Sequence, residues 1–178
     1  AQSNSEIDSL NGLYKNYYNV ALLQRMLSVF SSEIDPASSS GENAESSEII
    51  YPDDYAGAYI DEENNLHVKI IGKGNIQYYK NLLQNDSNVI FEEAETSLND
   101  LNQIQDLLDE VMFTYNIELT SLQQDTNTID IHLKDMSMEA AIIDYLCTHM
   151  SDFNENSITF YPECGIEFTS EAVVVISD

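Results

Sequence analysis

The chain has 178 residues, of which 32 are acidic and only 6 are basic, so its formal net charge is −26. Nucleic acids and anionic membrane surfaces both attract clustered Lys and Arg, so this composition predicts neither as a partner. No apolar run approaches the roughly 20 residues of a membrane-spanning helix, and we expect no membrane insertion.

The first predicted element is an amphipathic helix over residues 6–30. Its apolar side chains keep a mostly 3.6-residue period. We expect this face to pack on the body of the protein rather than on a partner. Residues 31–48 are rich in Ser and Glu and poor in apolar side chains, which predicts a flexible linker. The apolar stripe of the helix consists of Ile7, Leu10, Leu13, Tyr14, Tyr17, Ala21, Leu22, Met26, Val29 and Phe30.

One pattern of hairpin, helix and strand then occurs twice. The first copy has strands at 58–61 and 66–71, a helix over 75–84 and a strand at 89–91. The second copy has strands at 117–122 and 128–134, a helix over 137–150 that Ser137 can cap, and a strand at 157–161.

Alternation of apolar and polar residues supports the repeat. Leu66, Val68 and Ile70 alternate with His67 and Lys69, and the same alternation returns 63 residues later at Ile129, Ile131 and Leu133. Such alternation is typical of a strand with one buried and one solvent-facing side. We therefore expect two antiparallel sheets, each covered on one side by helices.

A helix that follows Ser97 joins the two copies. Ser97 is a good N-cap with Asp100 three residues later, and the apolar stripe of Leu98, Leu101, Ile104, Leu108 and Val111 predicts contact with both sheets. The predicted fold class is α+β, with two small ββαβ-type subdomains, a connecting helix and an N-terminal helix. The predicted divisions are 1–48 (helix and linker), 49–95, 96–116 (connecting helix), 117–163 and 164–178, a tail with a strand-like core at 172–176.

Residues that support catalysis or metal binding show no diagnostic spacing. His67 and His132 fall on the predicted solvent faces of strands and His149 near a helix end, and no His-x-x-x-His pair occurs. The acidic run at 61–63 lacks the Gly and the ligand spacing of an EF-hand. We predict no catalytic residues, no metal site and no cofactor, so an enzyme is the least favoured function.

The two cysteines leave an alternative open. Cys147 and Cys164 form a disulfide if the protein is exported and the pair meets, or remain two thiols. The chain begins at Ala1 without Met, and we expect a processed, secreted protein.

Four short segments, taken in order, resemble the prosegment of bacterial chymotrypsin-like serine proteases of the α-lytic protease and streptogrisin type. The resemblance covers about residues 51–161. The segments are YAGAYID at 55–61 with LHV at 66–68, NVIF at 88–91, SLNDL at 97–101, and a hairpin at 119–133 with Asn127 at its turn.

The resemblance implies a two-subdomain module that assists the folding of a serine protease catalytic domain and then inhibits it. In that family the last prosegment strand pairs with a hairpin of the protease, and the residues after it, here 162–165, occupy the active-site cleft. If the last strand carries this contact, Phe160→Asp weakens binding. The partner-binding residues that the resemblance implies are Ser157, Ile158, Thr159, Phe160, Tyr161 and Pro162.

The chain itself contains no protease. The protease is therefore expected beyond Asp178 in a precursor or on a separate chain, unless the module has been reused. The alternative function is a free-standing extracellular binding module on the same fold.

Overall fold

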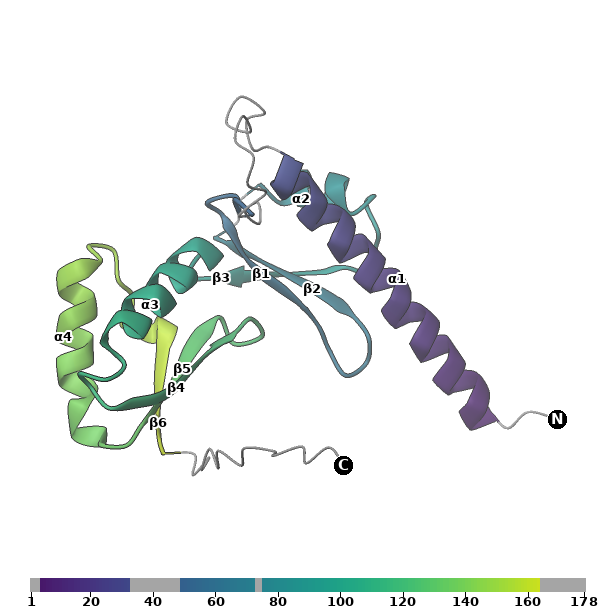
Figure 1. Cartoon of the computed structure of the whole chain (residues 1–178). Coiled ribbons are helices and arrows are strands. Elements are labelled where there is room, and N and C mark those ends of the chain that lie inside the picture. Colours follow the sequence, from purple (N-terminus) through teal and green to yellow (C-terminus); the bar gives the residue numbers. More distant parts are fainter. Residues whose placement is uncertain (1–3, 33–48, 73–74, 164–178) are drawn as a thin grey trace, which may run out of the picture.

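The computed structural model describes residues 4–32, 49–72 and 75–163 (Figure 1). Within these ranges the chain forms four α-helices and six strands. The helices are α1 (Asn4–Ser32), α2 (Ile76–Leu82), α3 (Leu98–Val111) and α4 (Glu139–His149). The strands are β1 (Tyr55–Ile60), β2 (Leu66–Ile71), β3 (Ile90–Ala94), β4 (Ile117–Gln123), β5 (Thr128–Leu133) and β6 (Ile158–Pro162). The predicted α+β fold class is confirmed.

Each sheet has three strands, in the orders β1-β2-β3 and β4-β5-β6. The hairpins are antiparallel, but β3 pairs parallel to β2 and β6 pairs parallel to β5. The expectation of purely antiparallel sheets is therefore wrong. A helical crossover between two strands of one sheet returns the chain to its starting end, so the third strand runs parallel to the second.

The two sheets match each other in register. Tyr55 pairs with Ile70 and Ile117 with Leu133, and each pair is followed by the same one-residue β-bulge. At the matching position of the two hairpin turns, Asn64 has φ 60° and Asn127 has φ 61°. Asn tolerates this left-handed conformation better than other non-Gly residues. The repeat inferred from the alternation is present in the backbone.

The molecule has two hydrophobic cores, and α3 contributes to both. Leu98 lies in the core of the first subdomain, whereas Leu101, Ile104 and Leu108 lie in the core of the second. Ser97 caps the helix, its Oγ accepting from Asp100 N at 3.1 Å. The predicted connecting helix and its cap are confirmed.

Helix α1 lies against the first subdomain and contacts the first hairpin turn through Lys15 and Asn16, and only its N-terminal end extends beyond it (Figure 1). Met26 and Phe30 are fully buried in the first core, but Tyr14 and Tyr17 are 74% and 68% exposed. The expectation that the stripe packs on the body is thus wrong for Tyr14 and Tyr17, and the side chains of Ile7 and Leu10 lie outside the described part of the helix. The reason is the face of the helix that meets the body: Lys15, Asn16 and Asn19 bond to the first hairpin turn, and Tyr14 and Tyr17 lie on another face of the same turns.

Two local predictions also change. Ser137 does not cap α4; Asp135 Oδ1 instead accepts from Ser137 N at 3.0 Å and begins a 3₁₀ turn ahead of the helix. Ser31 and Ser32 belong to α1, so the predicted start of the linker at residue 31 is wrong.

Several expectations concern residues outside the described ranges. They are the linker at 33–48, the cleft segment from residue 164 onward, the strand-like core at 172–176 and Cys164, and with it the disulfide. Cys147 is exposed on α4. Among the helices that the structure describes, none combines the length and the hydropathy that a membrane crossing requires.

Candidate functional site

Strand β6 forms one edge of the second sheet, with β5 on its inner side (Figure 1). Among the described strands none pairs with its other side. An edge strand of this kind presents backbone N–H and C=O groups with which another chain can pair. Strand β6, the strand that the resemblance implies for partner binding, therefore has an edge to which another strand can be added.

The six predicted site residues divide between the core and the surface. Ser157 precedes β6 in a 3₁₀ turn and is buried, with its hydroxyl donating to Asn154 O at 2.6 Å. Ile158 lies in the second core, and Phe160 packs against it. Thr159, which is partly exposed, and the exposed Tyr161 and Pro162 remain accessible. The first group holds the strand in place, and the second is available to a partner.

Tyr161 lies on the face of the second sheet that the helices do not cover. Its ring stacks on His132 of β5, with centroids 5.3 Å apart and planes at 22°. Leu119 of β4 flanks His132 on the other side. We call this surface the outer face of the second sheet.

A hollow of about 320 Å³ lies on this outer face. Two carboxylates, those of Asp125 and Asp130, belong to its lining together with hydroxyl groups. Its lining residues are Gln123, Asp125, Thr126, Thr128, Asp130, Thr159 and Tyr161. The hollow therefore adjoins the accessible residues of β6.

Strand β1 forms an edge of the first sheet, but unlike the edge of β6 it is partly covered by another part of the chain. Gln124, at the tip of the β4–β5 hairpin, accepts a hydrogen bond from Ala58 N through Oε1 at 2.8 Å. Gly57 permits this approach, since its φ is +118° and an added Cβ would lie 3.0 Å from the same oxygen. The hairpin of the second sheet therefore occupies part of this edge.

A buried ionic network on the first sheet was not anticipated. His67 is only 9% exposed, so its predicted solvent-facing position is wrong. Its Nε2 lies 2.9 Å from Asp61 Oδ2 and its Nδ1 lies 2.6 Å from Glu92 Oε1. Lys69 Nζ lies 3.2 Å from the other oxygen of Glu92. Tyr59 stacks on the His67 ring with centroids 4.5 Å apart and donates to Glu92, so it covers one face of the imidazole.

The network shifts the pKa values of its members. Burial by itself lowers the pKa of His67, but the hydrogen bonds to Asp61 and Glu92 outweigh it and the pKa is raised. The pKa of Asp61 is lowered, first by hydrogen bonds from Asn65 and then by His67. Burial raises the pKa of Glu92, but His67 and Lys69 bring it below its ordinary value. The ionised forms of all three groups are thus favoured together.

This network suits a structural role better than a chemical one. Both nitrogen atoms of His67 face carboxylates, so neither is free to take a proton from a substrate or to bind a metal. No group of three or more His, Cys, Asp or Glu side chains within the described ranges is arranged to hold a metal ion. Only the pairing of β2 with β3, which alternation alone does not predict, could have revealed the contact with Glu92.

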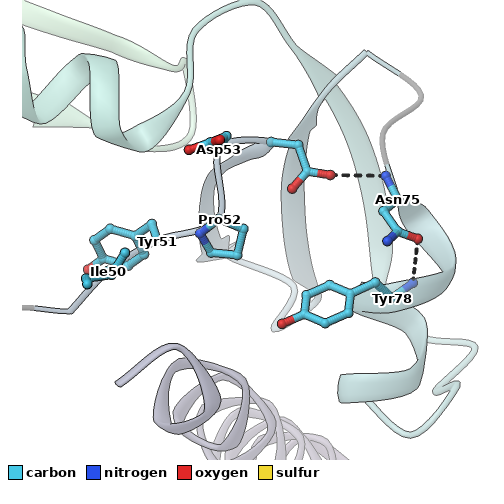
Figure 2. A pocket seen from close by; sticks show the side chains of 7 residues that line it. Ile50, Tyr51, Pro52, Asp53, Asn75 and Tyr78 are labelled. Atoms are coloured by element: carbon cyan, nitrogen blue, oxygen red, sulfur yellow. Dashed lines mark hydrogen bonds between the residues drawn. The ribbon is translucent and has the colours of Figure 1, made fainter. Parts of the chain in front are cut away.

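A second hollow, of about 390 Å³, lies beside the start of α2 and is shown in Figure 2. The dashed lines in Figure 2 mark the bonds from Asn75 N to Asp54 and from Tyr78 N to Asn75. The second oxygen of Asp54 accepts from Tyr79 OH at 2.5 Å. The Asp54 carboxylate therefore holds α2 against the start of β1. The remaining lining residues are Ile50, Tyr51, Pro52 and Asp53.

A scan of this chain against protein-family models and a search of curated proteins both found no match.

Proposed function

We propose that this protein is a non-catalytic, secreted, prosegment-like module that binds a chymotrypsin-like serine protease, assists its folding and inhibits it. The observation that carries the proposal is the position of β6. It is the last strand that the structure describes, and it is an edge strand with accessible residues at its end. Addition of a protease strand to β6 would use main-chain hydrogen bonds for affinity.

The arrangement of subdomains supports the same proposal. Two ββαβ units joined by a helix match the organisation that the sequence resemblance implies. The edge of β1 is partly occupied by Gln124, whereas β6 is paired with β5 alone in the described ranges. The second sheet is thus the better candidate for strand addition.

The second candidate is a free-standing extracellular binding module. Leu13, Tyr14 and Tyr17 of α1 are all more than half exposed, and grouped apolar side chains on a surface are typical of interaction sites. Figure 1 places this half of α1 on the side of the molecule away from β6. A partner that binds α1 would therefore leave β6 unused.

The test is a titration of the full chain against mature α-lytic protease and a streptogrisin, with hydrolysis of a chromogenic peptide as the readout. We expect nanomolar inhibition, and Tyr161→Ala is expected to weaken it by about tenfold, as truncation of an aromatic side chain at an interface commonly does. Leu119→Ala is the matched control. Leu119 is 39% exposed and Tyr161 is 40% exposed, and they lie on opposite edge strands beside the same His132.

The outcomes separate the two functions. Equal losses for Tyr161→Ala and Leu119→Ala would argue against β6 as the contact. A folded chain that inhibits neither protease would favour the binding module. Phe160→Asp is a poor test, because Phe160 packs against the second core and a charge at this partly buried position would also destabilise the subdomain.

A further inference from the structure

The two ring nitrogens of His67 each face a carboxylate oxygen, and this geometry favours the charged form of the ring. Nε2 lies 2.9 Å from Asp61 Oδ2, and Nδ1 lies 2.6 Å from Glu92 Oε1. A neutral imidazole carries one N–H, so its second nitrogen would direct a lone pair at a carboxylate. The imidazolium donates both bonds. The pKa of His67, which these hydrogen bonds raise against the effect of burial, points the same way.

The charged and titratable groups around this imidazolium come from each strand of the first sheet. Glu92 lies on β3, and Lys69 of β2 approaches its second oxygen at 3.2 Å. Tyr59 of β1 stacks on the ring, and the Asp125 carboxylate of the second hairpin acts electrostatically on Tyr59. Asp61 follows β1. Within the described ranges Glu92 thus has a second cation as partner, whereas the ion pair of Asp61 is with the imidazolium alone.

Asp61 also shapes the first hairpin turn. Its Oδ1 accepts from Asn65 N and its Oδ2 accepts from Asn65 Nδ2, both at 2.7 Å. Its backbone N–H donates to Asn65 O, and its carbonyl accepts from Asn64 N, both at 3.0 Å. The oxygen that holds the Asn65 side chain is the one that faces His67 Nε2. A movement of this carboxylate would therefore move the turn.

The same turn is the surface on which the part of α1 around residues 12–19 is held. Lys15 Nζ donates to Asn65 Oδ1 at 2.6 Å. Asn16 Nδ2 donates to Asn64 Oδ1 at 3.0 Å, and the buried Asn19 donates through Nδ2 to Asn64 O at 2.7 Å. A continuous series of hydrogen bonds thus leads from the imidazolium through the hairpin turn to α1.

We propose that protonated His67 holds this part of α1 on the first hairpin turn, and that loss of the proton loosens it. With one N–H left, the ring keeps its shorter bond, to Glu92, and turns a lone pair toward Asp61. The repulsion displaces the carboxylate and the turn with it. Met26 and Phe30 are fully buried, so they keep the other end of the helix in place.

The helix end is therefore docked at pH values below the folded pKa of His67 and loosened above it. The device is a conformational switch that pH operates inside the first subdomain. It is independent of the proposed function, because it involves α1 and the first sheet, and β6 takes no part in it.

The experiment is an NMR titration of the full chain between pH 6 and pH 9. It follows the ring signals of the three histidines and the side-chain amide signals of Asn16 and Asn19. We expect the amide signals to shift with the midpoint of the His67 ring, which lies above its ordinary value of 6.5. His67→Gln is expected to abolish this shift. His132→Gln is the matched control and is expected to retain it, since His132 also stacks on a tyrosine, but in the second sheet.

A second variant tests the coupling from the other side. Coupling between two equilibria is reciprocal, so weaker docking of α1 must lower the pKa of His67. Lys15→Met removes two bonds to the turn, those to Asn65 Oδ1 and Glu63 O, and leaves the core intact because Lys15 is only partly buried. The loss of a nearby positive charge would by itself raise the pKa of His67. A midpoint that moves to lower pH therefore supports the switch.

Three results would overturn the inference. The first is amide signals of Asn16 and Asn19 that do not change with pH, and the second is a pH dependence that persists in His67→Gln. The third is a His67 midpoint that stays or rises in Lys15→Met, which decides the matter even if His67→Gln does not fold. Because no protease enters these measurements, each result leaves the proposed function untouched.

Discussion

The side chain of Asn127 binds both backbone groups of Thr96, a residue at the start of α3. Oδ1 accepts from Thr96 N at 3.1 Å, and Nδ2 donates to Thr96 O at 2.8 Å. Both residues are buried. A turn residue of the second sheet thus satisfies the backbone at the junction between the subdomains, where neither sheet nor helix bonds can do so.

This pairing predicts that Asn127→Gly destabilises the protein by about 1–3 kcal/mol, because two buried backbone groups lose their partner. Gly keeps the positive φ of the turn, so backbone strain does not contribute. Urea unfolding measures the loss. Asn64→Gly is the matched control, since Asn64 has the same φ in the first hairpin. An equal loss at both positions would show that the Thr96 contact is not the cause.

We predict that a Gly→Ala substitution destabilises the protein at Gly57 but stabilises it at Gly12. Gly57→Ala is expected to cost about 1–3 kcal/mol, because its φ of +118° is disfavoured for Ala and the methyl group meets Gln124. Gly12→Ala lies inside α1 with its nearest contact at 3.4 Å and is expected to stabilise by about 0.5–1 kcal/mol. Thermal unfolding of both variants checks the signs, and destabilisation by Gly12→Ala would contradict the helical packing described for α1.

The His67 network predicts a contribution to stability that is lost as pH rises through the raised pKa of His67. The pKa of His67 is raised in the folded state, so its contribution is complete below the unfolded pKa of about 6.5 and is lost as pH rises through the folded value. Asp61 and Glu92 have lowered pKa values, so their contribution is lost on the acid side. Tyr59 stacks on the His67 ring, and Lys69 Nζ lies over the Tyr59 ring.

Urea unfolding of the wild type and of His67→Gln at pH 6 and pH 9 tests this dependence. The stability difference between the two proteins should be largest near pH 6 and smaller at pH 9. An equal difference at both values would mean that His67 does not carry the pH dependence.

The two halves of α1 predict different responses to truncation. Phe30→Ala is expected to cost about 3–5 kcal/mol, because Phe30 is fully buried against Tyr51 and Tyr55. Tyr17→Ala is expected to change stability by less than about 0.5 kcal/mol, since Tyr17 is 68% exposed. Chemical denaturation distinguishes them. A large effect of Tyr17→Ala would show that a second contact covers this half of the helix.

Local sequence patterns were sufficient to predict the helices and strands. The alternation at 66–71 and 128–134 predicts β2 and β5, and the stripe after Ser97 predicts α3, because which face a residue takes depends on its immediate neighbours along the chain. The repeat also follows from these patterns. The resemblance of the sequence to the prosegment family also implied that the last strand faces a partner, which agrees with its position at the edge of the sheet.

The contacts between distant residues follow from strand order and from the packing of the two subdomains. The pairing of β2 with β3 brings Glu92 to His67, 25 residues away in sequence, and turns an expected surface histidine into a buried ion pair. The approach of Gln124 to Ala58 spans 66 residues and occupies part of the β1 edge. Neither contact has a periodic signature, because each depends on strand order and on the packing of two subdomains. Local sequence patterns were enough to define which segments become helices and strands, whereas the packing between these elements set which polar groups are paired and which remain accessible to a partner.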